Sequence, residues 1–330
     1  MGKRRIAGTS GLGRRGPALV AALALAATLA GAGPAAAQTA GGAAWTGTSA
    51  AVTWSAQPTP RFREPDGNLN GISCTSPSFC MSVGWAGLAG AETAMWNGTS
   101  WQPEPFPSGQ DDILDAVSCT SPAFCVAVGG STAHETLIAT WDGTGWTVQS
   151  PSTQGFVLAG VSCSSPSACL AVGGTEESVN APALAERWNG QKWSTLTQPG
   201  APFIGDLNAV SCSSSSACTA TGYQIGWAPL IERWNGTHLT LQQAAAPPGN
   251  GPLTGVSCPD SDDCVAVGDV GISPPFTSPP YIEAWDGTAW SVMTSPAVAG
   301  GLAGVSCTAA TACTAVGSTL GSTRGTQGSV

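Results

Sequence analysis

The chain has 330 residues, of which 9% are charged, and it contains 44 Gly and 25 Pro. Ordinary soluble domains have roughly 25% charged residues, so this sequence indicates a fold with little polar surface per strand and many turns. Only 11 basic residues stand against 20 acidic ones, which argues against DNA, RNA and anionic membrane surfaces as partners, because phosphate contacts need Lys and Arg.

Residues 1–37 have the layout of a secretory signal peptide. An apolar run over 18–32 leads to the small-residue site Ala35-Ala36-Ala37, and basic residues precede the run at Lys3, Arg4, Arg5, Arg14 and Arg15. The run is shorter than the roughly 20 residues of a membrane span, which favours a cleaved signal over the alternative, an anchor helix. The export route stays open. The remaining segment, 38–330, holds 20 acidic against six basic groups, a net charge of −14, and has no second apolar stretch. We expect a single exported domain without a membrane span.

Cysteines reveal an internal repeat in this segment. All 12 fall into six C-x5-C pairs whose first members lie 44–49 residues apart: Cys74/Cys80, Cys119/Cys125, Cys163/Cys169, Cys212/Cys218, Cys258/Cys264 and Cys307/Cys313. Motifs such as GVSC precede each pair, and motifs such as VAVG follow it. After the first five pairs comes a second module: MWNGTSW, TWDGTGW, RWNGQKW, RWNGTHL and AWDGTAW.

Each repeat reads as four short strands. The first strand ends at the first Cys, the second is C-x-A-V-G, the third runs into Trp, and the fourth starts after the Asn-Gly or Asp-Gly step. These dipeptides are strong hairpin signals and predict a type I′ turn, in which both residues have positive φ. Four strands in about 46 residues is the size of a propeller blade. Apolar and small residues at successive positions favour strands buried on both faces.

We therefore predict an all-β, six-bladed propeller with four antiparallel strands in each blade. The sixth Cys pair is followed by no Trp-Asn-Gly module, whereas Trp45 and Trp54 near the start of the mature chain resemble an orphan hairpin. If that hairpin completes the last blade, the ring closes and loses its sheet edges. An open solenoid is the alternative. The repeats lie near 72–105, 117–151, 161–199, 210–247, 256–296, and 305–319 completed by 43–58.

The cysteine pairs are predicted to be disulfides, one in each blade. Two Cys flanking a five-residue turn lie opposite each other across a hairpin, and export favours oxidation. Zinc is the competing interpretation, but structural zinc prefers C-x2–4-C spacing and often His. The chain has only His134 and His238, and neither recurs in the repeat. No metal or other cofactor is expected.

The pattern L-x-x-V-S-C, C-x-A-V-G, W-[ND]-G-x-x-W resembles secreted repeat proteins of high-GC Gram-positive bacteria, the actinobacterial type. More distantly it is similar to Asp-box (BNR-repeat) propellers, which include sialidases and photosystem-assembly factors. The resemblance covers about residues 43–319 and implies the propeller fold. The spacing from Asp142 to Trp146 is one residue shorter than in an Asp box, and Cys pairs replace apolar positions. The resemblance therefore implies no enzymology.

Candidate catalytic residues are explained first by the repeat. Arg187 and Arg233 share a position before Trp, and Glu186, Glu232 and Glu283 share another, so repeat descent accounts for both sets. A sialidase-like or other extracellular glycoside hydrolase, which needs paired carboxylates, remains the alternative function. The acidic clusters Asp111-Asp112-Asp115 and Asp260-Asp262-Asp263 read as solvated turns, because no Ca²⁺ cage pattern accompanies them.

Residues that break the repeat point to a binding surface. Trp85, Tyr223, Trp227 and Phe276 fall in or beside the connections between the second and third strands, which share one face of a propeller. Exposed aromatic rings on a rigid scaffold suit contact with a sugar or a peptide, although such rings also pack loops onto blades. We predict a secreted, non-catalytic and monomeric binding or scaffold protein whose ligand is a surface glycan or a protein.

Overall fold

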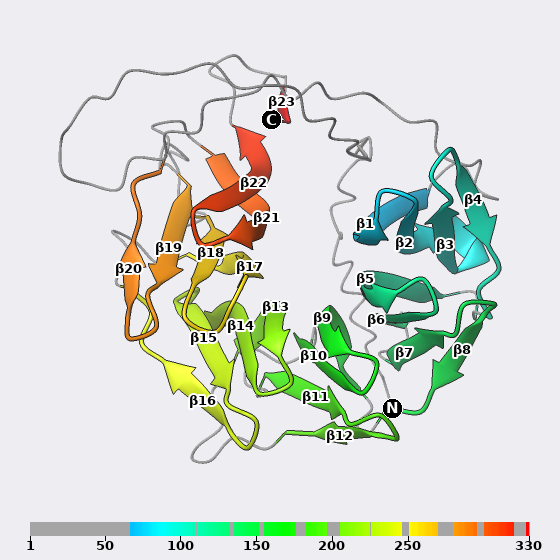
Figure 1. Cartoon of the computed structure of the whole chain (residues 1–330), viewed down its shortest axis with the longest axis horizontal. Coiled ribbons are helices and arrows are strands. Elements are labelled where there is room, and N and C mark those ends of the chain that lie inside the picture. Colours follow the sequence, from blue (N-terminus) through cyan, green and yellow to red (C-terminus); the bar gives the residue numbers. More distant parts are fainter. Residues whose placement is uncertain are drawn as a thin grey trace, which may run out of the picture.

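The computed structural model describes residues 67–107, 109, 111–131, 135–151, 155–175, 183–196, 205–224, 226–245, 251–269, 280–295, 300–319 and 328–329. In these residues six antiparallel sheets follow one another around an axis (Figure 1). The first five sheets have four strands each and the sixth has three. The predicted signal peptide, 1–37, and the predicted closing hairpin, 43–58, lie outside the described residues. No helix in the described part of the chain is long and apolar enough to cross a membrane.

The strands alternate in direction within each sheet. The first sheet contains β1 (Gly67–Ser76), β2 (Phe79–Ala86), β3 (Ala91–Trp96) and β4 (Trp101–Glu104). The second contains β5 (Asp112–Ser121), β6 (Phe124–Ser131), β7 (Thr136–Trp141) and β8 (Trp146–Gln149). The third contains β9 (Val157–Ser165), β10 (Ala168–Gly174), β11 (Leu184–Trp188) and β12 (Trp193–Thr195).

The fourth sheet contains β13 (Gly205–Ser214), β14 (Ala217–Gln224), β15 (Pro229–Trp234) and β16 (Leu239–Gln242). The fifth contains β17 (Leu253–Ser257), β18 (Cys264–Gly268), β19 (Tyr281–Trp285) and β20 (Trp290–Val292). The sixth contains β21 (Gly300–Ala309), β22 (Ala312–Thr319) and β23 (Gly328–Ser329), and β23 pairs with the last residues of β22. The first strand of each sheet lies innermost and the last strand described lies toward the periphery (Figure 1).

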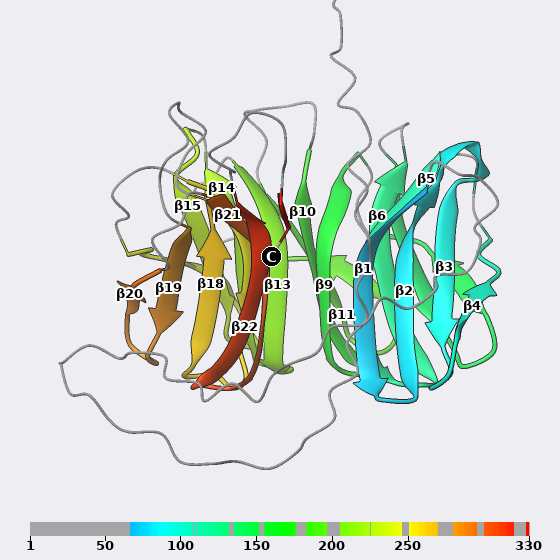
Figure 2. The same cartoon turned by 90° about the horizontal axis from the view of Figure 1, so that it is seen from above.

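This alternation gives the ring two unlike faces (Figure 2). We call one the turn face. It holds the connections from first to second strands, such as 77–78, and from third to fourth strands, such as 97–100. We call the other the loop face. It holds the connections from second to third strands, such as 87–90. It also holds the N-terminal end of the first strand of each sheet.

Disulfides close the hairpin between first and second strands in every sheet. All six predicted pairs are bonded, with Cα–Cα distances of 4.0–4.1 Å. The two Cys are direct partners across the strands, as Cys74 and Cys80 show. The disulfide prediction is confirmed, and no cysteine of the described residues is free to act as a zinc thiolate. The first strand does not end at its Cys as predicted, since β1 continues to Ser76.

The Asn-Gly and Asp-Gly hairpins form where predicted, but the predicted type I′ turn is wrong. Trp96 pairs with Trp101, which leaves a four-residue connection, and only Gly98 within it has positive φ, at 93°. Oδ1 of Asn97 accepts the N–H groups of Thr99 and Ser100, each at 3.0 Å. The side chain thus satisfies the backbone of a longer turn. Asp142, Asn189, Asn235 and Asp286 accept the corresponding bonds.

Apolar clusters fill the junctions between neighbouring sheets. Val126 and Val128 of β6, for example, pack with Leu158 and Val161 of β9. Second strands are covered on both sides, and every residue of β10 is buried. The prediction of strands buried on both faces is therefore confirmed. It also explains the low charge, because unpaired charges are too costly in such strands.

Candidate functional site

On the turn face, the tryptophan that ends the third strand is hydrogen-bonded to the disulfide hairpin in the first four sheets. Trp96 Nε1 donates to the carbonyl of Pro77 at 3.0 Å, which ties the third strand to the disulfide hairpin, and its ring lies 5.8 Å from that of Trp101. The second and third sheets repeat this arrangement, as Trp141 donates to Pro122 O and Trp188 to Pro166 O. In the fourth sheet Trp234 donates to Ser215 O at 3.1 Å. These aromatic rings therefore build the scaffold.

The cysteines belong to this scaffold as the predicted disulfides. Cys125 shows this most clearly, because its side chain is 0% exposed and packs in a core cluster with Met81 and Trp141. Its sulfur is bonded to that of Cys119. Cys125 is thus the structural disulfide partner that the sequence predicts.

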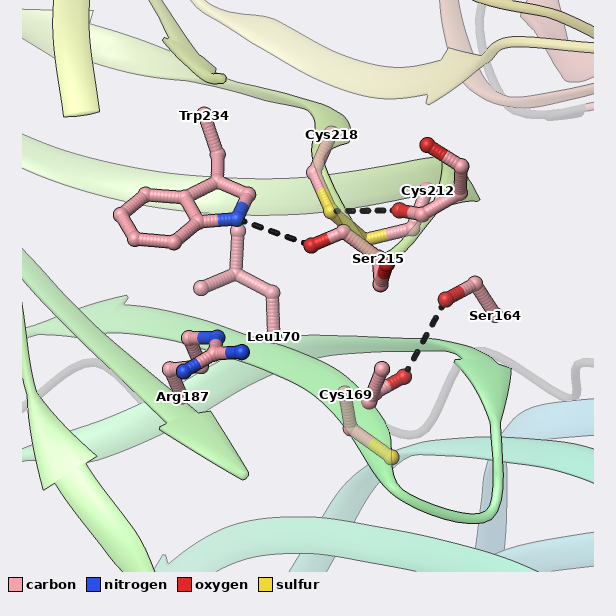
Figure 3. Close-up of a pocket in the computed structure, with 10 residues that line it drawn as sticks. Ser164, Cys169, Leu170, Arg187, Cys212, Ser215, Cys218 and Trp234 are labelled. Atoms are coloured by element: carbon pink, nitrogen blue, oxygen red, sulfur yellow. Dashed lines mark hydrogen bonds between the residues drawn. A yellow bond between two sulfur atoms is a disulfide. The ribbon is translucent and has the colours of Figure 1, made fainter. Parts of the chain in front are cut away.

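Figure 3 shows the turn-face pocket between the third and fourth sheets. Leu170, Arg187 and Trp234 line it together with the Cys212–Cys218 bridge, and the guanidinium of Arg187 lies 5.6 Å from the Trp234 ring. The space that it encloses, about 10 Å³, is that of roughly one water molecule. It is too small for a sugar ring or a peptide side chain.

Trp227, on the loop face, is different, because its side chain is 43% exposed. It lies in the connection between β14 and β15, at φ 66°, and is the one non-glycine residue with positive φ in the described part of the chain. For an L-residue this conformation costs about 1–2 kcal/mol. Strain of this kind is concentrated at ligand-binding and active sites.

The backbone of this connection fixes the position of Trp227. Gly226 precedes it in the left-handed region, at φ 84°. The N–H of Trp227 donates to the carbonyl of Gln224 at 2.9 Å, and the N–H of Gln224 donates to the carbonyl of Ala228 at 2.8 Å. Short hydrogen bonds on both sides hold the indole where it is presented to solvent.

Tyr223 stacks against the exposed indole of Trp227. The two rings are stacked, with centroids 4.8 Å apart and planes 20° from parallel. The Tyr223 hydroxyl donates to Oδ2 of Asp206 at 2.5 Å, and the two residues are direct partners in the pairing of β13 with β14. Burial and this carboxylate raise the pKa of Tyr223 to about 12. The phenol therefore remains protonated at physiological pH and keeps donating to Asp206.

Asp206 lies at the boundary with the third sheet. A Cβ atom built on Gly174 of β10 would clash with Oδ1 of Asp206, so only glycine there leaves room for the carboxylate. We use the name aromatic platform for Asp206, Tyr223 and Trp227. It combines one exposed ring, one supporting ring and one carboxylate.

Two of the four predicted ligand-binding residues are brought together. Trp85 lies at the end of β2 and is half-buried, three sheets away from the platform (Figure 1). It pairs with Asn68 as Tyr223 pairs with Asp206, so the two positions correspond in the repeat. Phe276 lies outside the described residues. Sequence reasoning missed Asp206, although it is the only charged residue at that position of the repeat.

The repeated glutamates are buried inside the scaffold. Glu186, Glu232 and Glu283 are 0–1% exposed. Oε2 of Glu283 accepts the N–H of Ala245 at 2.8 Å, and the Tyr281 hydroxyl donates to the carbonyl of Ala245 at 2.6 Å. Burial raises the pKa of Glu283 to about 7, against the opposing effect of the bonds from Ala245 and Tyr281. Glu283 thus anchors the segment that leaves the fourth sheet.

No protein-family model matches the chain, and no curated protein matches it. Among solved structures, that of YCF48 bound to D1 peptide aligns with 74% of this chain and 72% of its own, at 13% identity and a TM-score of 0.49. That of the SapL1 lectin in complex with alpha methyl fucoside aligns with 77% of this chain and 87% of its own, at 11% identity and a TM-score of 0.51. The likeness to SapL1 extends to the fold alone and agrees with a propeller-type arrangement.

Proposed function

We propose that this protein is an exported, non-catalytic binding propeller that holds a glycan on its loop face. The observation that carries the proposal is Trp227, 43% exposed in a strained conformation and stacked on Tyr223. Stacking on Tyr223 offsets part of the cost of that conformation, but 43% of the side chain remains exposed. A ligand that covers the exposed ring would offset the rest.

The chemistry of the platform favours a sugar. One face of a pyranose ring presents C–H groups that pack on a flat aromatic ring, and its hydroxyls are donors for a nearby carboxylate such as Asp206. The surplus of acidic over basic residues disfavours phosphorylated or sulfated ligands. A neutral glycan therefore fits better than an anionic one. A protein of similar fold, the SapL1 lectin, was solved in complex with alpha methyl fucoside, so this architecture is compatible with a sugar site.

The proposal also covers export, closure of the ring and the completion of the sixth sheet. Residues 1–37 direct export and are removed, and the six sheets form a closed, monomeric propeller. The hairpin of Trp45 and Trp54, within 43–58, supplies outer strands to the sixth sheet. In support, that sheet has only the two-residue strand β23 beside β22, whereas the other five have full third and fourth strands.

The direct test is binding of the secreted protein to immobilised neutral polysaccharides, with unrelated proteins and peptides as a second panel. Trp227→Ala should weaken glycan binding at least tenfold, because the stacking surface is lost. Leu241→Ala is the matched control, since Leu241 lies in the same sheet and is 40% exposed; it should bind as the wild type does.

Three outcomes would overturn the proposal. One is the absence of binding to every polysaccharide, and another is binding that survives Trp227→Ala. The third is release of reducing sugar ends from a bound polysaccharide, which would identify a hydrolase. Binding to a protein that depends on Trp227 would assign the platform to a peptide ligand in place of a glycan.

A further inference from the structure

The two faces of the ring differ in charge. Every basic side chain of the described residues belongs to the turn face: Arg187 and Arg233 directly precede the tryptophans that end their third strands, and Lys192 and His238 lie in the connections that follow. Arg233 is used within the scaffold, since its guanidinium lies 4.5 Å from the centroid of the Trp285 ring. Among the described residues, cationic side chains are therefore absent from the face that bears the aromatic platform.

The loop face carries acidic side chains instead. Asp112 begins β5, Glu135 directly precedes β7, Asp206 is the second residue of β13, and Asp269 directly follows β18. A surface that carries acidic groups and no basic ones attracts cations and raises their local concentration. This face is therefore suited electrostatically to a cationic ligand.

Asp206 brings such a charge into the aromatic platform itself. Its Oδ2 accepts the Tyr223 hydroxyl at 2.5 Å, whereas its Oδ1 lies beside Gly174, where any larger residue would clash with it. The residue is half-buried, and no Lys, Arg or His of the described chain lies on its face. The neutral phenol leaves the negative charge of the carboxylate uncompensated, so a cationic N–H donor would form the stronger hydrogen bond there.

The exposed indole adds a second attraction for a cation. The face of a Trp ring attracts an ammonium group more strongly than the face of Tyr or Phe does. Tyr223 connects the two attractions, because its ring stacks on that of Trp227 at 4.8 Å and its hydroxyl bonds to Asp206. A ligand that contacts both ends of the platform must combine a flat C–H face with an ammonium group nearby.

We propose that the ligand of the aromatic platform is a glycan of amino sugars with free amines. A pyranose ring covers Trp227, and the ammonium of the same or the next sugar pairs with Asp206. This inference rests on the proposed function, because it specifies which glycan the platform binds. An N-acetylated sugar has the same ring without the charge, so it gains the stacking and not the ion pair. The lysine side chains of a basic peptide carry the charge without the flat face.

A comparison of two oligosaccharides tests the inference. Calorimetry in slightly acidic buffer compares β-1,4-linked glucosamine oligomers with fully N-acetylated oligomers of the same length. The secreted protein should bind the free-amine form about tenfold more tightly, as a charged hydrogen bond predicts. Asp206→Asn keeps an acceptor for Tyr223 and removes the charge. It should weaken binding of the free-amine form about tenfold and leave that of the acetylated form within about twofold.

Asp142→Asn is the matched control, because it removes the same charge from the turn face. The structure tolerates this change, since Asn occupies the same turn position in three other sheets, as Asn97, Asn189 and Asn235. The control should leave both affinities unchanged. General attraction of a polycation to an acidic protein would be weakened equally by Asp142→Asn and Asp206→Asn and would survive Trp227→Ala, and that result would overturn the inference.

The salt dependence of the wild-type protein keeps the test decisive even where Asp206→Asn fails to fold. Added NaCl should weaken binding of the free-amine form, because it screens the ion pair, and should leave that of the acetylated form unchanged. The same salt dependence for both forms would overturn the inference.

The remaining outcomes separate this inference from the proposed function. Equal affinities for the two oligomers, both lost in Trp227→Ala, would overturn the amino-sugar assignment and leave a glycan-binding propeller standing. No binding of either oligomer or of any neutral polysaccharide would overturn both. Binding of an oligolysine peptide that depends on Asp206 and Trp227, with no binding of the oligosaccharides, would assign the platform to a basic protein segment.

Discussion

The turn face and the loop face carry the same kinds of side chain and use them in different ways. On the turn face the rings of Trp141 and Trp146 meet at 5.8 Å, and Trp141 Nε1 donates to the Pro122 carbonyl. On the loop face Trp227 also stacks on a neighbouring ring, yet its own indole remains in solvent. The tryptophans that recur in the repeat are structural, whereas Trp227, which breaks the repeat, keeps 43% of its side chain exposed.

The difference follows from what each face must do. The turn face recurs from sheet to sheet, so its side chains pack on one another and leave only small spaces. The loop face is free to vary, because its connections lie beyond the hydrogen-bonded ladder of the sheets. Functional differences between proteins built from this repeat are therefore expected on the loop face.

The largest change in unfolding free energy is expected for Trp141→Ala, which tests the structural role of the turn face. Trp141 is 3% exposed, and removing a buried Trp typically costs about 3–5 kcal/mol of unfolding free energy. Thermal or denaturant unfolding measures the loss. Glycan binding by the folded variant should be unchanged, because Trp141 lies on the turn face. A variant that stays fully stable and loses binding would reverse the roles assigned to the two faces.

An intermediate effect is expected from the buried carboxylate of Glu283. Its pKa is raised from an unfolded value near 4.5 to about 7 in the folded protein. Between these pH values the folded state binds a proton that the unfolded state has released, so the contribution of Glu283 to stability is fully present below about pH 4.5 and is lost as pH rises through about 7. At about 1.4 kcal/mol for each pKa unit, the difference between 4.5 and about 7 corresponds to a loss on the order of 3–4 kcal/mol.

Glu283→Gln isolates this contribution. The amide oxygen of Gln can still accept the N–H of Ala245, and it carries no charge at any pH. Subtracting the variant's pH profile of unfolding free energy from that of the wild type should leave a fall centred between the unfolded pKa of 4.5 and the folded value of about 7. Parallel profiles would show that Glu283 titrates normally and is not buried as described.

The smallest effect is expected for Trp227→Gly. Glycine adopts φ 66° without the steric cost that Trp bears, so the variant should gain up to about 1 kcal/mol of stability or remain unchanged. It should also lose glycan binding. Denaturant unfolding and the polysaccharide panel measure the two quantities, and a marked loss of stability would show that the indole packs the loop onto the blade.

The sequence allowed most of the fold to be predicted because its signals are local. The identical spacing of the Cys pairs predicted six hairpins, and the Trp-x4-Trp spacing predicted the positions of the outer strands. The predicted type I′ turn was wrong because that prediction considers only the φ preferences of the Asn-Gly pair. In the structure, Oδ1 of Asn97 also accepts the N–H groups of Thr99 and Ser100, which favours a longer turn. The position of Glu283 was foreseen as structural, but its bond to Ala245 spans 38 residues and has no local signal.

The candidate site was predicted only in part, for the same reason. Trp227 and Tyr223 are four residues apart, and their departure from the repeat marked both. Asp206 lies 17 residues from Tyr223, and their bond depends on the register of β13 against β14. The space for its carboxylate depends on Gly174 of another sheet. Contacts of this kind require the assembled sheets.

The most direct test of the account is an NMR titration of the indole N–H signals with soluble methyl pyranosides, including those of glucose, mannose, galactose and fucose. The account predicts that the signal of Trp227, assigned through its loss in Trp227→Ala, shifts with a saturable dependence on one of these sugars. The turn-face signals, such as that of Trp141, should stay in place. Saturable shifts confined to turn-face indoles, with the Trp227 signal unmoved, would contradict the assignment of the loop face as the binding surface.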